Sequence, residues 1–302
     1  MMAAMKYHNP VLLFESIDGL DIKPDGIYVD VTFGGGGHSR EILNRLGEKG
    51  RLFAFDQDED ARGNAIDDDR FVLIGENFSH IKRFLRFYGV KKVHGILADL
   101  GVSSHQFDEP ERGFTTRFEA DLDMRMNRKN ALSAFEVVNH YGEEELGNVL
   151  YQFGELRNAR ALASQIVKSR EGQEIKTSFE LKEVLQRFLP KNREHKILAQ
   201  IFQAIRIEVN QEMEMLKEFL LQVPDLLMND GRLSVISYHS LEDRLVKRFI
   251  QNGKFEGEPE KDFYGNISVP LKKIGKLIIP SPDEIKENNR ARSAKLRVAI
   301  KV

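Results

Sequence analysis

A run of four glycines, Gly34–Gly37, constrains the fold of this chain more than any other short feature. It follows an apolar segment at residues 26–33 and precedes a helical pattern at residues 38–46. Glycine is used where the backbone must adopt a positive φ or approach another group closely. A glycine turn that joins a strand to a helix predicts that a ligand meets the chain there.

The first hundred residues alternate between short apolar strands and helices. Strands are expected at 26–33, 51–56, 70–74 and 93–101, with helices at 38–46, 57–66 and 80–89. This alternation predicts a parallel sheet that is covered on both faces. Strand patterns return at 231–237, 276–280 and 294–302, and the last two are expected to be antiparallel at the sheet edge.

The alternation is interrupted in the middle of the chain. Residues 107–196 have no strand pattern but contain short amphipathic helical segments at 131–141, 143–153, 159–170 and 178–189. From Ile197 to Leu220, apolar residues recur at steps of three and four, which predicts one long helix with a core-facing side. We therefore expect a doubly wound α/β domain (residues 1–106 and 201–302) with an inserted all-helical domain at 107–200.

Two phosphate-binding loops do not fit the glycine run. A P-loop needs a lysine that is absent after Gly37, and a dinucleotide fingerprint needs a third glycine where this chain has Ser39. Asp30 lies just before the run, and Asp56 ends the second strand, where a carboxylate can accept both ribose hydroxyls. S-adenosylmethionine fits, because it has a ribose, a positive charge and no phosphate. The alternative is a tight turn with an incidental Asp30.

Further residues are expected at the carboxyl ends of the strands, where open parallel sheets bind ligands. Phe78 follows the third strand and is placed to stack on an adenine, although an aromatic residue there is more often core. Asp99 ends the fourth strand. Because Asp30, Asp56 and Asp99 each end a strand at the same edge, together they predict a site.

Charge is uneven along the chain. The net charge of the 302 residues is −2, yet residues 272–301 hold nine Lys and Arg against three acidic residues. Such a segment indicates either a contact with an anion or a solvated charged face. If residues 294–300 form a strand, Lys295 and Arg297 share one of its faces.

Several chemistries are excluded by composition. The chain has no cysteine, so it has no disulfide, thiolate metal site or thiol nucleophile of the kind used for pyrimidine C5 methylation. The histidines show no ligand spacing, so no metal is expected. No apolar run is long enough for a membrane span and the N-terminus lacks a signal-peptide pattern, so a cytoplasmic protein is expected.

Blocks of sequence in order along nearly the whole chain resemble a known family. These are YHNPVLL, DVTFGGGGHS, FAFDQD, GILADLGVSSHQFDEPERGF, LDMRM, FQAIRIEVNQE, GRLSVISYHSLEDRLVKRF and NNRARSAKLRVA. They resemble the RsmH/MraW family, bacterial methyltransferases that modify N4 of a cytidine in the decoding region of small-subunit ribosomal RNA. The resemblance implies a Rossmann-like methyltransferase sheet with a helical insertion, S-adenosylmethionine as cofactor, and 16S ribosomal RNA, within the small subunit or a late assembly particle, as partner.

The resemblance also carries the family's cofactor contacts to particular residues of this chain. They fall on Gly36, Gly37, His38, Asp56, Phe78, Asp99 and Gln106. We expect Asp99 to position the methionine end of the cofactor and the incoming amine, since in-line alignment supplies most of the rate.

Candidate RNA contacts lie in the second half of the chain. His239 is open to two interpretations: a contact with the target base, or an ordinary residue before a helix capped by Ser240 and Asp243. Arginine and lysine suit phosphate contacts, and the candidates are Arg290, Arg292, Lys295 and Arg297. Arg206 is expected to form an internal ion pair with Glu208 or Glu212 instead.

Two rival functions remain open at this point. A DNA amino-methyltransferase would also be doubly wound, but the Asn/Asp-Pro-Pro-aromatic loop that such enzymes carry after strand four is missing here. A non-catalytic ribosome-assembly factor could keep the fold, but the intact run from Gly34 to His38 with Asp56 and Asp99 argues against it.

Overall fold

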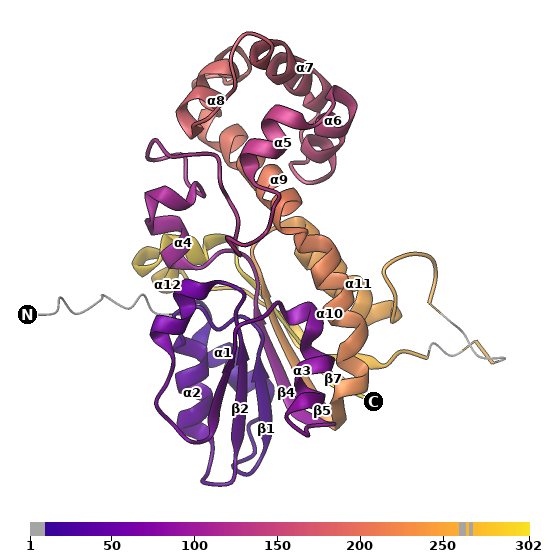
Figure 1. Ribbon diagram of the computed structural model, residues 1–302. Helices are drawn as coiled ribbons and strands as arrows, with labels where there is room; N and C mark the ends of the chain where they lie inside the picture. Colours follow the sequence, from indigo (N-terminus) through magenta and orange to yellow (C-terminus); the bar gives the residue numbers. More distant parts are fainter. Residues whose placement is uncertain (1–9, 260–263, 266–267) are drawn as a thin grey trace, which may run out of the picture. The chain divides into compact units, whose positions relative to one another are not determined.

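The chain forms two compact units. The computed structural model describes residues 10–259, 264–265 and 268–302. One unit, the sheet unit, comprises Met1–Gly101 and Met213–Val302, and the other, the helical unit, is Val102–Glu212 (Figure 1). The insertion that the sequence predicts at 107–200 lies within the helical unit. Tyr7, His8 and Asn9 of the YHNPVLL block lie outside the described residues.

The sheet unit is built on a mixed sheet of seven strands. Their order is β3-β2-β1-β4-β5-β7-β6. The strands are β1 (Ile27–Asp30), β2 (Arg51–Phe55), β3 (Phe71–Ile74), β4 (Val93–Asp99), β5 (Leu227–Ser237), β6 (Leu271–Ile278) and β7 (Lys295–Lys301). β1 to β5 are parallel, whereas β7 pairs antiparallel with both β5 and β6. The doubly wound fold and the antiparallel closing strands are therefore confirmed.

Helices cover both faces of this sheet (Figure 1). They are α1 (Leu13–Leu20), α2 (Gly37–Arg45), α3 (Ile81–Phe87), α10 (Glu212–Leu226) and α11 (Ser240–Asn252). The sheet unit also contains α12 (Pro282–Glu287) and 3₁₀ turns at Glu59–Asn64, Phe78–His80 and Asn289–Ser293. Alternate strand residues point to opposite faces. Thus Val29 packs with α3, α10 and α11, while its neighbour Tyr28 packs with α1 and α2.

The helical unit has a core of its own. Its helices are α4 (Ser104–Asp108), α5 (Ala134–His140), α6 (Glu143–Gln152), α7 (Ala159–Arg170), α8 (Ser178–Val184) and α9 (Glu194–Asn210), with 3₁₀ turns at Pro110–Arg112 and Gln186–Phe188. Leu146, Leu150, Leu162 and Ile201 are fully buried there. Among the described residues, no helix is both long enough and apolar enough to cross a membrane.

Some predicted elements were wrong in detail. The long helix expected from Ile197 to Leu220 is two helices, α9 and α10, because Gln211 adopts a left-handed conformation with φ of 50°. The helix expected at 57–66 is a 3₁₀ turn at Glu59–Asn64. The expected ion pair of Arg206 is confirmed, since its guanidinium contacts Glu212 through two hydrogen bonds of 2.7 and 2.9 Å.

Candidate active site

The glycine run forms the turn from β1 into α2. Gly34 and Gly36 have φ of 51° and 75°, which side-chain-bearing residues rarely adopt. A Cβ on Gly36 would lie 2.8 Å from the Phe33 ring, and one on Gly37 would lie 2.2 Å from Pro10. A Cβ on Gly35, in contrast, would meet nothing within 4 Å. The turn is thus packed tightly on its inner side and leaves bare backbone open at Gly35.

Asp30 anchors this turn from inside. Its carboxylate accepts hydrogen bonds from the Ser39 hydroxyl at 2.7 Å and from the Thr32 amide at 3.1 Å, and its side chain is buried. Burial raises the pKa of Asp30 above its ordinary value. These contacts and its burial give Asp30 a role in holding the turn, and its contact with a cationic ligand stays a prediction.

Asp56 joins the glycine turn to the end of β2. One carboxylate oxygen accepts the Gly34 amide at 2.7 Å and the other accepts the Asp58 amide at 2.9 Å. Burial raises the pKa of Asp56 to about 6, although both amides act in the opposite direction. A carboxylate oxygen has two lone pairs, so Asp56 retains acceptor capacity toward a ligand after binding these amides.

Phe78 begins the short 3₁₀ turn that follows β3. Its ring is partly buried and packs edge-on against Phe219 of α10, with 5.5 Å between the ring centroids. The core therefore holds the Phe78 ring on one side, and the contact with Phe219 fixes the orientation of the ring.

Asp99, at the end of β4, lies at the centre of a polar cluster. The Tyr238 hydroxyl donates a hydrogen bond of 2.8 Å to one carboxylate oxygen, and His38 Nδ1 lies 3.8 Å from the other. The Asp99 amide donates to the Thr32 hydroxyl at 2.6 Å, so the backbone here is tied to the end of β1. Burial raises the pKa of Asp99 to about 6, opposed by the positive charge of His38 in its protonated form and by the Tyr238 hydroxyl.

His38 presents an acceptor toward Asp99. Its Nε2 lies 3.2 Å from the Val11 carbonyl, which can only accept, so we assign the ring proton to Nε2. Burial lowers the pKa of His38, which keeps the ring neutral near neutral pH. The Nδ1 lone pair and the Asp99 carboxylate therefore face each other across 3.8 Å, too far for a hydrogen bond between them. Two neighbouring acceptors of this kind favour a ligand that donates N–H groups.

Gln106 lies in the helical unit. It is buried, and its side chain closes a capping box with Ser103 at the start of α4. Ser103 N–H donates to the Gln106 side chain at 3.0 Å, and the Gln106 amide reaches the Ser103 hydroxyl at 3.2 Å. The structure therefore gives Gln106 a helix-capping role, and its cofactor contact stays a prediction.

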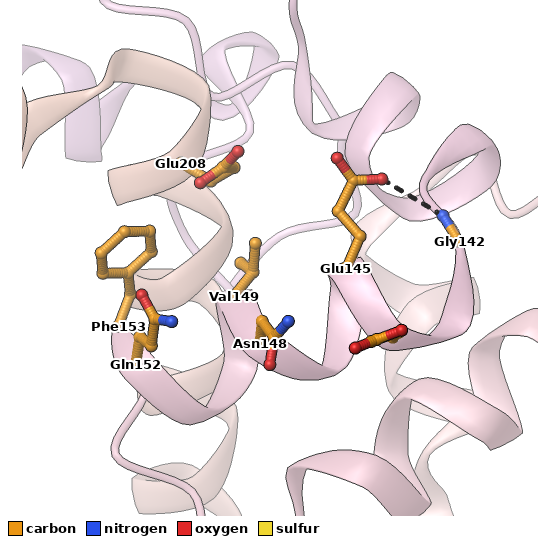
Figure 2. Close-up of a pocket in the computed structure, with 8 residues that line it drawn as sticks. Gly142, Glu145, Asn148, Val149, Gln152, Phe153 and Glu208 are labelled. Carbon is orange, nitrogen blue, oxygen red and sulfur yellow. Dashed lines mark hydrogen bonds between the residues drawn. The ribbon is translucent and has the colours of Figure 1, made fainter.

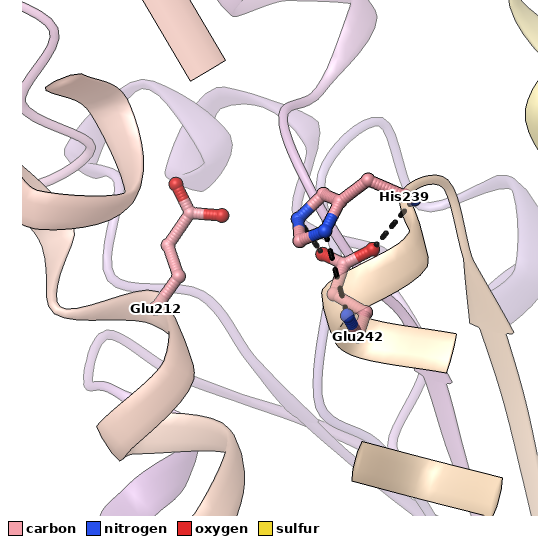
Figure 3. Close-up of side chains that lie close together, drawn as sticks. All are labelled: Glu212, His239 and Glu242. Atoms are coloured by element: carbon pink, nitrogen blue, oxygen red, sulfur yellow. Dashed lines mark hydrogen bonds and ion pairs between the residues drawn. The ribbon is translucent and has the colours of Figure 1, made fainter. Parts of the chain in front are cut away.

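His239 caps α11, as Figure 3 shows together with Glu242. The Glu242 carboxylate is buried, accepts the Tyr238 amide at 2.9 Å and lies 3.2 Å from His239 Nε2. The capping box is thus formed by His239 and Glu242, and the predicted pair of Ser240 and Asp243 was wrong by one position. The helix begins one residue earlier than the Ser-based pattern suggested because a histidine nitrogen takes the capping role.

The four predicted phosphate contacts differ in their surroundings. Arg290 and Arg292 lie in the 3₁₀ turn before β7, and Arg292 is exposed. Lys295 and Arg297 share one face of β7, and both donate to Asp243 of α11, with 2.7 Å for the shortest contact of Arg297. Lys295 and Arg297 therefore use part of their hydrogen-bonding capacity within the protein, on Asp243. RNA contact by all four residues stays a prediction.

Tyr238 and Thr32 were missed by sequence reasoning. Both lie directly beyond the carboxyl ends of strands, Tyr238 after β5 and Thr32 two residues after β1. Their position after a strand could have identified them, because residues at the carboxyl ends of parallel strands line the ligand site, and Asp99 was predicted on that ground. Hydroxyl groups carry no charge, so a pattern of charged residues at strand ends does not include them.

The chain is similar to known proteins along nearly its whole length. The profile of the MraW methylase family matches residues 5–302. The ribosomal RNA small subunit methyltransferase H of Flavobacterium johnsoniae is 69% identical over 302 residues, 100% of both chains. That of Bacteroides thetaiotaomicron is 55% identical and covers 98% of each. A solved rRNA methylase from Streptococcus thermophilus aligns with 99% of each chain at 13% identity and a TM-score of 0.43, a likeness that carries no functional argument.

Proposed function

Because this chain belongs to the MraW methylase family, we propose that it methylates the N4 exocyclic amine of a cytidine in the decoding region of 16S ribosomal RNA. The chain is an S-adenosylmethionine-dependent methyltransferase, and its substrate is small-subunit ribosomal RNA. The structural observation that carries the proposal is the pair of acceptors on His38 and Asp99 at the carboxyl edge of the sheet.

The residues at this edge fit the chemistry of S-adenosylmethionine. That cofactor supplies an electrophilic methyl group on a positively charged sulfur. Its α-ammonium group needs acceptors, which the Asp99 carboxylate and His38 Nδ1 provide 3.8 Å apart. Its ribose hydroxyls need an acceptor, and Asp56 would bind them with the lone pairs that its two backbone contacts leave over.

The remaining predicted contacts would orient the cofactor. Gly36 and Gly37 are the family contacts at its methionine end. Their missing side chains let the turn pack on Phe33 and Pro10, and the turn leaves bare backbone open at Gly35. The Phe78 ring, fixed by Phe219, would stack on the adenine. Gln106 is the remaining family contact carried over to this chain.

Asp99 is the residue we assign to positioning at the reacting centre. The cytosine amine is a poor nucleophile because its lone pair is delocalised into the ring, so alignment with the methyl group is the main source of rate. The Tyr238 hydroxyl and the amide contact with Thr32 hold Asp99 from two sides. Near neutral pH, a pKa of about 6 leaves the carboxylate mostly ionised and able to accept from an N–H donor.

The substrate is proposed to be ribosomal RNA held in a structured particle. With a net charge of −2, the protein has no strong general attraction for naked RNA. A base inside a folded RNA must also be splayed out to reach a site at a sheet edge. We propose the small ribosomal subunit or a late assembly particle as the partner, no metal requirement, and the cytoplasm as the location.

The test is mass spectrometry of 16S ribosomal RNA from cells with and without the gene. Loss of one N4-methyl group from a decoding-region cytidine, restored by the wild-type gene and not by an Asp99→Ala variant, is the expected result. Unchanged methylation would refute the proposal. Purified protein should also methylate small subunits and not DNA, whereas transfer to DNA would favour the rival DNA amino-methyltransferase. Absence of S-adenosylmethionine binding in calorimetry would favour a non-catalytic assembly factor.

A further inference from the structure

Two cavities in the chain differ sharply in charge. One, of about 540 Å³, lies in the helical unit (Figure 2) and is lined by Gly142, Glu144, Glu145, Asn148, Val149, Gln152, Phe153 and Glu208. The other, of about 310 Å³, lies in the sheet unit between α11, β6 and β7 and is lined by Lys247, Ile250, Gln251, Lys273, Ile274, Gly275, Lys276, Leu277, Arg297 and Val298. The first carries carboxylates, which repel RNA, and the second carries cations.

The cationic cavity is formed where the end of the sheet meets α11. Lys247 and Gln251 follow Asp243 at steps of four residues on α11, so they share its face. Lys273 is in register with Ala299 of β7, which packs on the α11 side of the sheet. The pairing of β6 with β7 then shifts between Ile274 and Ile278, and this irregular segment contains Lys276.

The lysines of this cavity are available for a ligand. Lys247, Lys273 and Lys276 are exposed and make no hydrogen bond or ion pair within the part of the chain that the structure describes. The carboxylate of Asp243 on the same face of α11 pairs with Arg297 and Lys295. No acidic side chain is among the described residues that line the cavity. Cations that converge on one hollow repel each other, and an anion placed among them relieves that repulsion.

We infer that the α11–β6–β7 cavity is a binding site for the phosphate backbone of the substrate RNA. This inference rests on the proposed function, because an RNA methyltransferase is the reason to choose RNA over other anions. A volume of about 310 Å³ is at the small end of ligand pockets, of a size for a phosphate and its sugar. The cavity adds Lys247, Lys273 and Lys276 to the RNA contacts expected from the sequence. Nearby, Lys295 and Arg297 are partly engaged in ion pairs with Asp243.

The test measures binding to small ribosomal subunits and to protein-free 16S ribosomal RNA by filter retention at several salt concentrations. The perturbing variant is Lys247→Glu with Lys276→Glu. The matched control is Lys49→Glu with Lys91→Glu, which makes the same change of charge at exposed positions of the sheet unit outside the cavity. A third variant, with Gln at Lys247, Lys273 and Lys276, removes the charges without adding new ones.

The expected result is a loss of affinity of about 10–100-fold for both RNA substrates in the Glu variant, with a salt dependence shallower by about one unit per lost contact. The Gln variant should lose less, the control pair little, and S-adenosylmethionine affinity should stay unchanged in all three. Equal binding by the cavity variant and the control would overturn the inference. So would a loss confined to whole subunits, because it would indicate contact with a ribosomal protein.

The same experiment separates this inference from the proposed function. If the wild-type protein binds small ribosomal subunits but transfers no methyl group to their RNA, the proposed function fails while the binding data still decide the role of the cavity. If the wild-type protein methylates the RNA and the cavity variants match the control, only the inference fails.

Discussion

Replacing Asp99 by Asn should stabilise the cofactor-free protein while impairing its activity. The Asp99 carboxyl is held in a site that raises its pKa from 3.8 to about 6, chiefly by burial. The folded state thus binds the proton more tightly than the unfolded state. Stability is therefore greatest when Asp99 is protonated, and it falls as the pH rises from about 4 through about 6. Asn keeps the shape, cannot ionise, and avoids this loss.

The magnitude follows from the size of the pKa shift. About two pKa units at 1.36 kcal/mol each give a stabilisation of about 3 kcal/mol at pH 8, which shrinks to about half at pH 5. This is an upper value, because the side chain retains 22% exposure. For a domain of this size, 1 kcal/mol corresponds to about 2–4 °C in the melting temperature, so up to about 6–12 °C is expected at pH 8.

The assay compares melting temperatures of the wild type and the variant between pH 5 and 8 without cofactor, and cofactor affinity by calorimetry. Asp69→Asn provides the matched control, since Asp69 is exposed in a loop. The Asp99→Asn variant should also bind S-adenosylmethionine about 10–100-fold more weakly, as a charged hydrogen-bond partner is lost. A variant destabilised to the same degree at every pH would show that the reasoning about the buried charge is wrong.

Four further outcomes are expected. Tyr238→Phe removes the hydroxyl that donates to Asp99, so the pKa of the Asp99 carboxyl should rise further. The acid limb of the pH–rate profile should then move to higher pH by about one unit. An unmoved limb would mean that Asp99 does not control it. Asp56→Ala should weaken cofactor binding in calorimetry, and unchanged affinity would remove Asp56 from the ribose site. Gly36→Ala should lower the free energy of unfolding by at least about 1 kcal/mol in urea titrations, because φ is 75° there; equal stability would contradict the left-handed turn. Arg292→Glu should weaken ribosomal RNA binding and spare cofactor binding, and a loss of both would indicate misfolding.

Local sequence patterns were sufficient for most of the fold. Apolar runs separated by turns located the parallel strands, and the aspartates predicted at the carboxyl ends of these strands lie there. The end of α9 at Gln211 could not be predicted from the sequence pattern, because the apolar residues continue at helical spacing on both sides of it. A single left-handed residue ends one helix and lets the next begin, and a periodic apolar pattern contains no information on the φ of one residue.

The strand-end positions of the charged candidate residues were predictable from the sequence, whereas the partners that hold these residues were not. Asp99 was found from its strand, whereas the hydroxyl of Tyr238 reaches it from 139 positions further along the chain. The capping role of His239 was missed because histidine is not a typical capping residue. The pairing of Arg297 with Asp243 depends on how α11 packs on β7, which a single strand pattern does not specify.

The helical unit lies between β4 and β5 in the sequence, and this order affects how the sheet is completed during protein synthesis. β4 ends at Asp99, and its neighbour β5 begins only at Leu227. At about 5–20 residues per second, the ribosome needs about 6–25 s to make the segment between them. For that time one edge of a buried strand has no partner, and an open strand edge can pair with other chains. The helical unit, whose core comes entirely from this segment, can finish folding while β4 is still without its partner.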